Sequence, residues 1–248
     1  MQPKDQALDV WGEFACFTRP ELKVERFSYP VPTPSAVRGI YDAIYCKPKE
    51  FRWQVTSVEI LVPPAYVALR RNEVKDKISV KNALEWANGE SPPEPIWADG
   101  TNDDLGTDLK GRTQRQTMAL RDVSYRLHAE IRPWPGYEDR QPGMEEQFRR
   151  RAAHGKCIYQ PYFGCREFPA YFELVDIGAP PPRGKPFDLD IGLMLYDIFD
   201  LGKPGVAITR ADDVCISLFR ASVSSGTLVV PGYCSADVIK VPKGGTDA

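Results

Sequence analysis

Residues 27–48, FSYPVPTPSAVRGIYDAIYCKP, contain one short helix whose ends can be placed from residue type alone. Thr33 suits the N-cap, and Pro34 suits the first helical position, where a missing N–H leaves no hydrogen bond unmade. Spacing of i, i+3, i+4 and i+7 predicts one buried stripe made of Val37, Ile40, Tyr41 and Ile44. Pro48 ends the element. The segment therefore predicts an amphipathic helix packed on a core.

The exit of this helix carries two groups with chemistry. Tyr45 follows the last residue of the stripe, so we expect it to turn off the buried face and to lie near Lys47. An aromatic hydroxyl beside an ammonium group can position a reacting hydroxyl and offset a developing negative charge. The exit of the helix therefore brings a hydroxyl and a cation together.

Strands are predicted on both sides of the helix. Alternating apolar residues predict strands over 7–17, 51–62, 123–131 and 168–174, and a second helix over 144–153. We expect Gly12 to mark a bulge or bend and the second strand to be irregular near Thr56. The order strand, helix, strand, insertion, strand, helix, strand predicts an α+β protein with a ferredoxin-like (RRM-like) domain.

Two further stretches divide the chain. Residues 66–110 are polar and lack sustained periodicity, which indicates a functional insertion or, alternatively, a solvated loop. The proline-rich segment 179–186 indicates a linker, followed by strands at 189–195, 214–218 and 228–230, with a hairpin turn at Ser225 and Gly226. We predict domains at 1–178, with 66–110 as an inserted thumb, and at 179–248, the second being a small antiparallel β domain. Residues 240–248 are predicted to be disordered.

Composition excludes several classes of protein. The 248 residues are 42% hydrophobic and 27% charged, as in soluble globular proteins, and contain no membrane-length apolar run. Because residues 1–9 lack an apolar core, we expect no signal peptide. We expect a cytoplasmic protein that does not contact a membrane. Six cysteines without a CxxC pair, and two histidines, predict reduced thiols with no disulfide framework, no metal site and no cofactor.

Basic residues gather in clusters although the net charge is only −2. The last cluster is interleaved with aromatic residues, among them Tyr159 and Tyr162, and cations beside rings are what single-stranded RNA requires. The alternative is a set of solvated charged faces. The candidate RNA-binding residues are Lys23, Arg26, Arg70, Arg71, Arg112, Arg115, Arg121, Arg149, Arg150, Lys156 and Arg166.

Several blocks of sequence resemble one protein family in the same order. They are VWGEFACFTRPELKVERFSYPVPTPSAVRGIYDAIYCKP (10–48), RRNEV (70–74), RTQRQTMALRDVSYRLHAEI (112–131) and QPYFGCREFPAYFEL (160–174). Together they resemble the CRISPR-associated Cas-five family, in its type I-C (Dvulg) branch, over roughly residues 8–235.

The resemblance implies a function. Members of the branch cut CRISPR repeat RNA without a metal, using the RNA 2′-OH as nucleophile. They stay on the crRNA 5′ handle as a subunit of the interference complex. The implied partners are repeat RNA, the other type I-C subunits and possibly target DNA. The resemblance also places an extended, hairpin-like thumb within residues 66–110.

The resemblance associates cleavage with a tyrosine, matched by Tyr45, and with an adjacent lysine and histidine at the start of the second helix. That position here is Gly143, Met144, Glu145, so the pair is missing, and Lys47, close to Tyr45 in sequence, is the nearer candidate for the phosphate cation. The resemblance therefore gives Tyr45 and Lys47 as the candidate catalytic residues. A binding-only subunit of the same fold is therefore the alternative function. Helix geometry places His154 about 15 Å from Met144, where we expect it to complement the helix dipole. His128 is expected to be an exposed histidine beside arginines.

Overall fold

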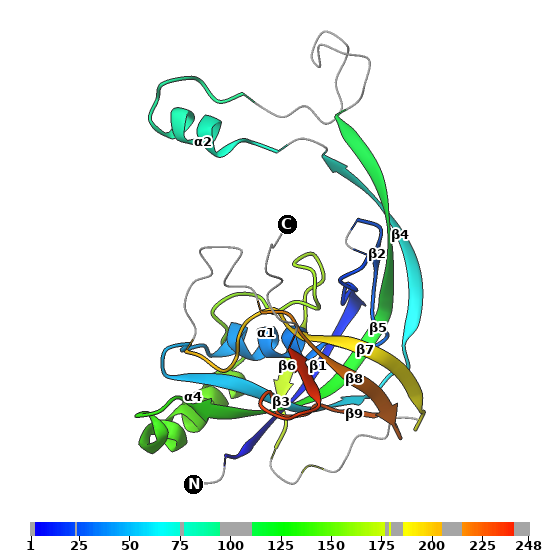
Figure 1. Cartoon of the computed structure of the whole chain (residues 1–248), viewed down its shortest axis with the longest axis vertical. Helices are drawn as coiled ribbons and strands as arrows, with labels where there is room; N and C mark the ends of the chain where they lie inside the picture. The colour runs from blue at the N-terminus through cyan, green and yellow to red at the C-terminus, as the bar shows by residue number, and fades with distance from the viewer. Residues whose placement is uncertain are drawn as a thin grey trace, which may run out of the picture. The chain divides into compact units, whose positions relative to one another are not determined.

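The computed structural model describes residues 3–22, 24–74, 77–94, 111–176, 179, 186–204 and 215–240. Its elements, in chain order, are β1 (Asp5–Ala15), β2 (Arg26–Phe27), α1 (Pro34–Ile44), β3 (Phe51–Ile60), β4 (Ala65–Val74), α2 (Val80–Ala87), β5 (Arg112–Pro133), η1 (Glu138–Arg140), α4 (Gln141–Ala153), β6 (Tyr171–Leu174), β7 (Leu189–Asp197), β8 (Ser217–Ser224), β9 (Thr227–Val229) and β10 (Val238–Lys240). Figure 1 follows them from blue to red along the chain.

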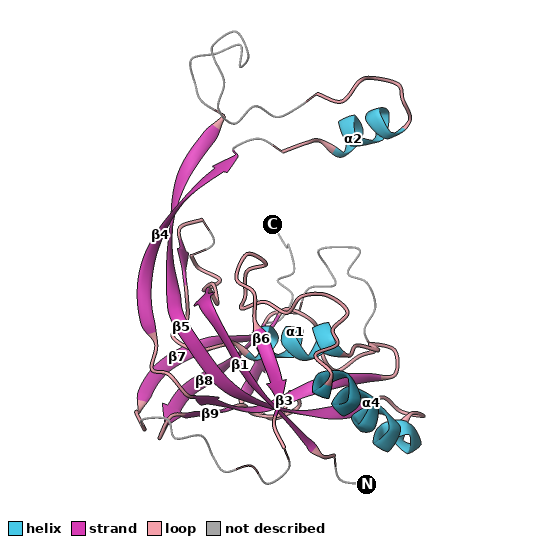
Figure 2. Ribbon diagram, turned by 180° about the vertical axis from the view of Figure 1, so that it is seen from behind, coloured by secondary structure: helices cyan, strands magenta, loops and turns pink. Residues whose placement is uncertain are grey.

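The fold is mixed α/β, with a large antiparallel sheet and few helices, which confirms the predicted class at that level. The strand order is β10-β8-β9-β3-β5-β1-β6, with β2 and β4 also paired to β5 and β7 paired to β8. Figure 2 shows how strands dominate the described chain. The strands after residue 186 join the same sheet because β9 pairs with β3.

The described residues group into two compact units, one from 1–67 and 118–248 and the other from 68–117. The second unit holds most of β4, the helix α2 and the beginning of β5. Strand β4 was missed from sequence because its side chains are only partly buried or exposed along its whole length, so no apolar alternation marks it. Residues 95–110 of the predicted insertion, and most of the predicted 179–186 linker, lie outside the described residues.

Helix α1 has the predicted capping and burial. The Thr33 hydroxyl accepts a hydrogen bond from the backbone N–H of Ala36 at 3.2 Å. The predicted stripe is the buried face of the helix: Val37, Ile40, Tyr41 and Ile44. The Tyr41 hydroxyl lies 2.7 Å and 2.9 Å from the carbonyl oxygens of Gln6 in β1 and Leu127 in β5. These bonds fix α1 on the central strands.

Aromatic packing joins α1 to α4 and β3. The ring of Tyr41 lies 4.9 Å from that of Trp53 and 5.5 Å from that of Phe148, measured between centroids. All three side chains are buried. Burying rings of this size supplies much of the hydrophobic stabilisation of a core. The start of α4 is thereby held beside the end of α1, where the candidate site lies.

The predicted irregularities have different outcomes. The pairing of β3 with β5 shifts between Val55 and Ser57, which confirms the irregularity near Thr56.

Gly12, expected at a bulge, pairs opposite Val123. A Cβ on Gly12 would come within 2.8 Å of the Pro169 carbonyl oxygen and 2.9 Å of the Phe163 ring, so close packing requires this glycine. Ser225 and Gly226, with φ of 49° and 82°, form the predicted hairpin turn between β8 and β9.

His128 corrects an expectation about the polar face of the sheet. Its ring nitrogens lie 2.6 Å from an Asp5 carboxylate oxygen and 2.8 Å from a Glu59 carboxylate oxygen. Burial disfavours the charged imidazole, but hydrogen bonds and charge from the two carboxylates outweigh it and raise the pKa of His128. The residue is therefore a partly buried bridge across β1, β5 and β3, not an exposed histidine beside arginines.

Candidate functional site

Tyr45 is held rigidly at the end of α1. It is the C-cap, with an extended backbone, and its N–H donates to the Tyr41 carbonyl. The indole N–H of Trp53 donates to the Tyr45 carbonyl at 2.9 Å. The Tyr45 ring packs on that of Phe51, with centroids 5.2 Å apart. These contacts hold Tyr45 beside Lys47, as the sequence predicted, but the residue is only 8% exposed, so the expectation that it turns off the buried face is wrong.

The hydroxyl of Tyr45 stays protonated at neutral pH. Burial of the ring, together with the charge of Glu50, raises the pKa of Tyr45 by more than Lys47 and Arg151 lower it. A phenol with a pKa above 10 is a poor general base at pH 7. The hydroxyl is suited instead to positioning a reacting group by hydrogen bonding.

Lys47 lies beside Tyr45 and is oriented by Glu50. Its ammonium nitrogen is 3.1 Å and 3.2 Å from the two Glu50 carboxylate oxygens. Hydrogen bonding to Glu50 raises the pKa of Lys47, so the lysine is fully charged at neutral pH. The lysine side chain is 45% exposed, which leaves the ammonium accessible to a phosphate.

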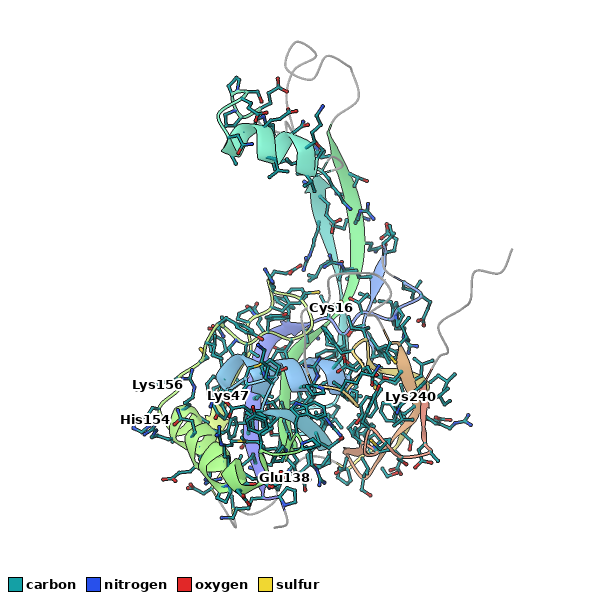
Figure 3. The ribbon with its side chains drawn as sticks, turned by 60° about the vertical axis from the view of Figure 1, so that its left-hand side comes forward. Cys16, Lys47, Glu138, His154, Lys156 and Lys240 are labelled. Atoms are coloured by element: carbon teal, nitrogen blue, oxygen red, sulfur yellow. The ribbon has the colours of Figure 1, made fainter. Side chains whose placement is uncertain are left out.

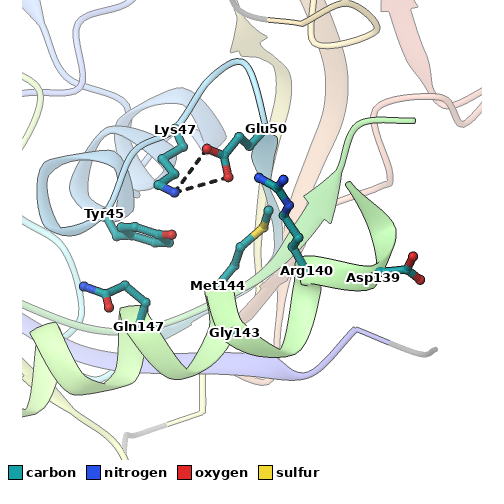
Figure 4. Close-up of a pocket in the computed structure, with 8 residues that line it drawn as sticks. All are labelled: Tyr45, Lys47, Glu50, Asp139, Arg140, Gly143, Met144 and Gln147. Atoms are coloured by element: carbon teal, nitrogen blue, oxygen red, sulfur yellow. Dashed lines mark hydrogen bonds and ion pairs between the residues drawn. The ribbon is translucent and has the colours of Figure 1, made fainter. Parts of the chain in front are cut away.

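An open groove of about 620 Å³ lies in front of these residues. Figure 4 shows its lining: Tyr45, Lys47, Glu50, Asp139, Arg140, Gly143, Met144 and Gln147. Met144, from the start of α4, and Arg140, from the end of η1, reach toward the groove opposite Tyr45, whereas Asp139 points away (Figure 4). The groove thus joins a hydroxyl to two cations, one from each of two elements distant in sequence. We call it the first groove.

Helix α4 also caps the end of α1. The Arg151 side chain donates to the Ile44 carbonyl at 2.6 Å, and the backbone N–H of Ile158 donates to the Ala43 carbonyl at 2.6 Å. These bonds satisfy carbonyls that a helix end leaves unpaired. The Arg151 charge also acts to lower the pKa of Tyr45. A third cation therefore lies near the hydroxyl.

The resemblance places the lysine–histidine pair at the start of α4, and the two side chains found there, Met144 and Glu145, point in different directions. Met144 lines the first groove. Glu145 is buried and accepts hydrogen bonds from the Gln141 side chain at 2.8 Å and from the Lys4 backbone N–H at 3.1 Å. The apolar thioether of Met144 therefore faces Tyr45 where the resemblance predicts a titratable side chain. None of the groove's lining residues is a histidine.

The predicted RNA-binding residues fall into separate places. Arg149 and Arg150 are on α4, Lys156 follows it, Arg166 is in the next loop, and Arg121 is on β5. Figure 3 labels Lys156 and His154 at the end of α4. Arg26 lies 3.3 Å from Glu167 and 3.5 Å from the Cys165 sulfur, so it ties β2 to that loop. Lys23 lies outside the described residues.

Four of the predicted arginines belong to the second unit. Arg70 and Arg71 are on β4, and Arg112 and Arg115 are on β5. Arg115 forms an ion pair with Glu73 at 3.0 Å, which neutralises part of this positive group. All four lie on the paired strands β4 and β5.

His154 caps α4, as the sequence predicted. Its Nδ1 lies 2.7 Å from the Arg150 carbonyl oxygen, which can only accept, so Nδ1 carries the proton. His154 does not line the first groove.

Sequence reasoning did not select Arg140 or Arg151 for the site. Arg151 could have been found from helical spacing, because it precedes buried Ala152 and follows buried Phe148 by three positions. Arg140 is placed by η1 and by its contact with the Tyr137 ring, 5.3 Å from guanidinium to centroid, which no sequence pattern shows.

The described residues lack two kinds of feature. Within those ranges, no group of three or more His, Cys, Asp or Glu residues is placed to hold a metal ion. No helix in the described part of the chain has the length and apolar character needed to cross a membrane.

Comparison with known proteins gives close relatives. A family described as CRISPR-associated protein (Cas_Cas5), in its Cas5d form, matches residues 7–231. A protein of Thermus thermophilus named CRISPR pre-crRNA endoribonuclease Cas5d is 37% identical over 244 residues, covering 95% of each chain. A protein of the same name from Mannheimia succiniciproducens is 37% identical over 239 residues, covering 93% of this chain and 96% of the relative.

Solved structures agree on the fold. A crystal structure of a CRISPR-associated protein has a TM-score of 0.59 at 18% identity and covers 95% of this chain and 96% of that one. A functionally uncharacterized protein from Streptococcus mutans has a TM-score of 0.57 at 18% identity, with 95% and 97% covered. With the near full-length sequence matches, these findings confirm the family: the chain belongs to the CRISPR-associated Cas5 family, in its type I-C branch, Cas5d.

Proposed function

We propose that this protein is a metal-independent endoribonuclease that cuts CRISPR repeat RNA in the first groove. The observation that carries the proposal is the protonated Tyr45 hydroxyl held beside the charged Lys47 in a groove that also presents Arg140. The two relatives named CRISPR pre-crRNA endoribonuclease support the same substrate.

The reaction follows from these groups. The RNA 2′-oxygen attacks the adjacent phosphorus and loses its proton, while the bond from phosphorus to the 5′-oxygen breaks and that oxygen gains a proton. The products are a 2′,3′-cyclic phosphate and a 5′-hydroxyl. Tyr45 orients the 2′-hydroxyl by hydrogen bonding, and Lys47 offsets the charge that develops on the phosphorane oxygens. Arg140 holds the strand by its phosphate.

The proposed partners follow from the function. After cleavage the protein stays on the crRNA 5′ handle as a subunit of the interference complex, which also engages target DNA. Arg149, Arg150, Lys156 and Arg166 are the proposed RNA contacts of the first unit, with Arg26 and Arg121. Arg70, Arg71, Arg112 and Arg115 are those of the second. Lys23 remains a candidate from sequence.

The proposed architecture is a ferredoxin-like domain within residues 1–178, interrupted by a thumb at 66–110. The order β6-β1-β5-β3 and the antiparallel pairing of each neighbour support it, because this is the strand order of a split βαβ pair. The β-rich residues 179–248 are proposed as a second domain that extends the sheet through β9.

A binding-only subunit is the second candidate, and two observations favour it. Lys47 is already paired with Glu50, and Met144 occupies the groove position of a titratable residue. Such a protein would grip the 5′ handle in the same groove without cutting it.

One experiment separates the two functions. The purified protein is incubated with its own CRISPR repeat RNA in EDTA, and the product ends are identified. Cleavage to a cyclic phosphate and a 5′-hydroxyl supports the enzyme. Tight binding of intact RNA rejects the enzyme and leaves the binding-only subunit. Cleavage that requires added divalent metal rejects the proposed chemistry.

A further inference from the structure

A second groove, of about 540 Å³, runs along α1 from its N-cap Thr33 to Asp42. Its other walls come from Phe17 and Thr18 after β1, from the loop after α4, and from the end of β7 with the residues that follow it. Two aromatic side chains on its lining are open to solvent: Tyr159 is 46% exposed and Phe199 is 38% exposed. Tyr162 adds a third ring. Exposed rings gathered in a concave site are unusual in a folded protein and mark places where a ligand binds.

A fixed polar group lies among these rings. The Arg38 side chain donates to both carboxylate oxygens of Asp197, at 2.8 Å and 3.3 Å, and to Asp42 at 2.6 Å. Asp197 is 1% exposed, and one of its oxygens also accepts from the backbone N–H groups of Ile198 and Phe199. These three bonds use three of the five N–H groups of the guanidinium. Arg38 can therefore still donate, and Asp42, 20% exposed, can still accept.

Gly39 leaves space above the helix in this groove. Glycine in the middle of a helix is less favourable than alanine, so it needs a reason. A Cβ on Gly39 would meet no atom within 4 Å, so packing inside the protein does not require the glycine. Gly39 lines the second groove. The glycine leaves the helix backbone open to close approach by a ligand in the groove.

The chemistry of the groove selects the kind of ligand. Arg38 is balanced by two carboxylates, so the local charge does not attract a phosphate. Planar rings together with a free donor and a free acceptor match the faces and edges of a nucleobase. At 1.5 Å per residue, Arg38 is about 10 Å along the helix from Tyr45, and a stacked strand advances about 3.4 Å per nucleotide. A base in the second groove is therefore a few nucleotides from a phosphate in the first.

We propose that the second groove binds one unpaired nucleobase of the repeat RNA, stacked on Tyr159 and hydrogen-bonded by Arg38 and Asp42. The inference rests on the proposed RNA substrate and adds a specificity site to it. The bound base sets the register of the strand, so that a chosen phosphate lies beside Tyr45 and Lys47.

The test measures binding of the protein's own repeat RNA by the intact chain. Tyr159→Ala weakens binding about 5- to 100-fold, the range for loss of one stacked base, and Tyr159→Phe, which keeps the ring, restores it. The matched control is Ile158→Ala: this neighbour is 57% exposed and does not line the groove, so its affinity equals that of the wild type. Gly39→Ala raises the melting temperature and weakens RNA binding, two changes that a purely structural glycine cannot show together.

A set of repeat RNAs, each with one base removed, identifies the bound nucleotide. Wild type binds more weakly to the RNA that lacks the base at one unpaired position. Tyr159→Ala binds that RNA with the same affinity as the intact repeat. Equal RNA affinity of Tyr159→Ala and Ile158→Ala overturns the inference. If Tyr159→Ala then fails to assemble with the other complex subunits, the groove binds a protein, which also overturns it. Wild type that binds no repeat RNA overturns the proposed function itself, so the two failures are distinguishable.

Discussion

The first groove, at the end of α1, and the second groove, along the same helix, differ in how their polar groups are held. In the first, Lys47 and Arg140 are solvent-accessible cations around a hydroxyl. In the second, Arg38 is locked by two carboxylates on α1 and at the end of β7. Accessible cations suit a phosphate whose charge changes during a reaction, whereas a neutralised, fixed arginine suits recognition of an uncharged ring. One helix therefore carries a groove suited to the reaction and another suited to binding a base.

The largest expected effect is on stability and comes from the second groove. Asp197→Asn removes the buried counter-charge of Arg38 and leaves only Asp42, and removing one partner of a buried ion pair costs about 3 kcal/mol. The melting temperature should fall by about 6–12 °C. Asp42→Asn is the matched control, because Asp42 is 20% exposed and Asp197 only 1% exposed. A fall no larger than that of Asp42→Asn would contradict the structural role of Asp197.

The next effect is on the rate of cleavage and comes from the first groove. Tyr45→Phe should slow single-turnover cleavage of repeat RNA about 10- to 100-fold, or about 1.4–2.7 kcal/mol, with little change in RNA affinity. Lys47→Ala should cost at least as much, because it removes the cation nearest the hydroxyl. Rates are measured in EDTA with saturating protein. Unchanged rates in both variants would move the reaction out of this groove.

A smaller effect is expected outside both grooves, at His128. Its folded-state pKa is raised, so the stabilisation by Asp5 and Glu59 is complete below the ordinary histidine pKa and is lost as pH rises through the folded-state value. His128→Gln should therefore lose stability at pH 6, on the order of 1 kcal/mol, and much less at pH 9. Melting curves at both pH values give the comparison. An equal loss at both would mean that protonation contributes nothing.

The smallest effect is expected at His154. Its ring donates to the Arg150 carbonyl and does not line the first groove. His154→Ala should change the cleavage rate by no more than about twofold, or about 0.4 kcal/mol. The assay is the one used for Tyr45→Phe. A tenfold loss would show that the loop after α4 reaches the reacting phosphate and would weaken the distinction between the grooves.

The predictions from sequence succeeded where local patterns decide structure. Capping at Thr33, the buried stripe of α1, the placement of Tyr45 beside Lys47 and the hairpin at Ser225 depend on neighbours within a few residues. Strand β4 failed because its pairing with β5 is remote in sequence and its side chains carry no apolar alternation. Gly12 was assigned a local role, whereas its contacts with Phe163 and Pro169 come from a distant loop.

The sequence by itself determined the family, the class of fold and the identity of the helix that carries both grooves. Only the tertiary structure decided which charges act together. Arg140 approaches Tyr45, Asp197 approaches Arg38, and Asp5 and Glu59 bracket His128 across three strands. The periodicity of apolar residues shows which face of a helix or strand is buried. The pairing of distant side chains depends on how the helices pack on the sheet, which a short stretch of sequence does not show.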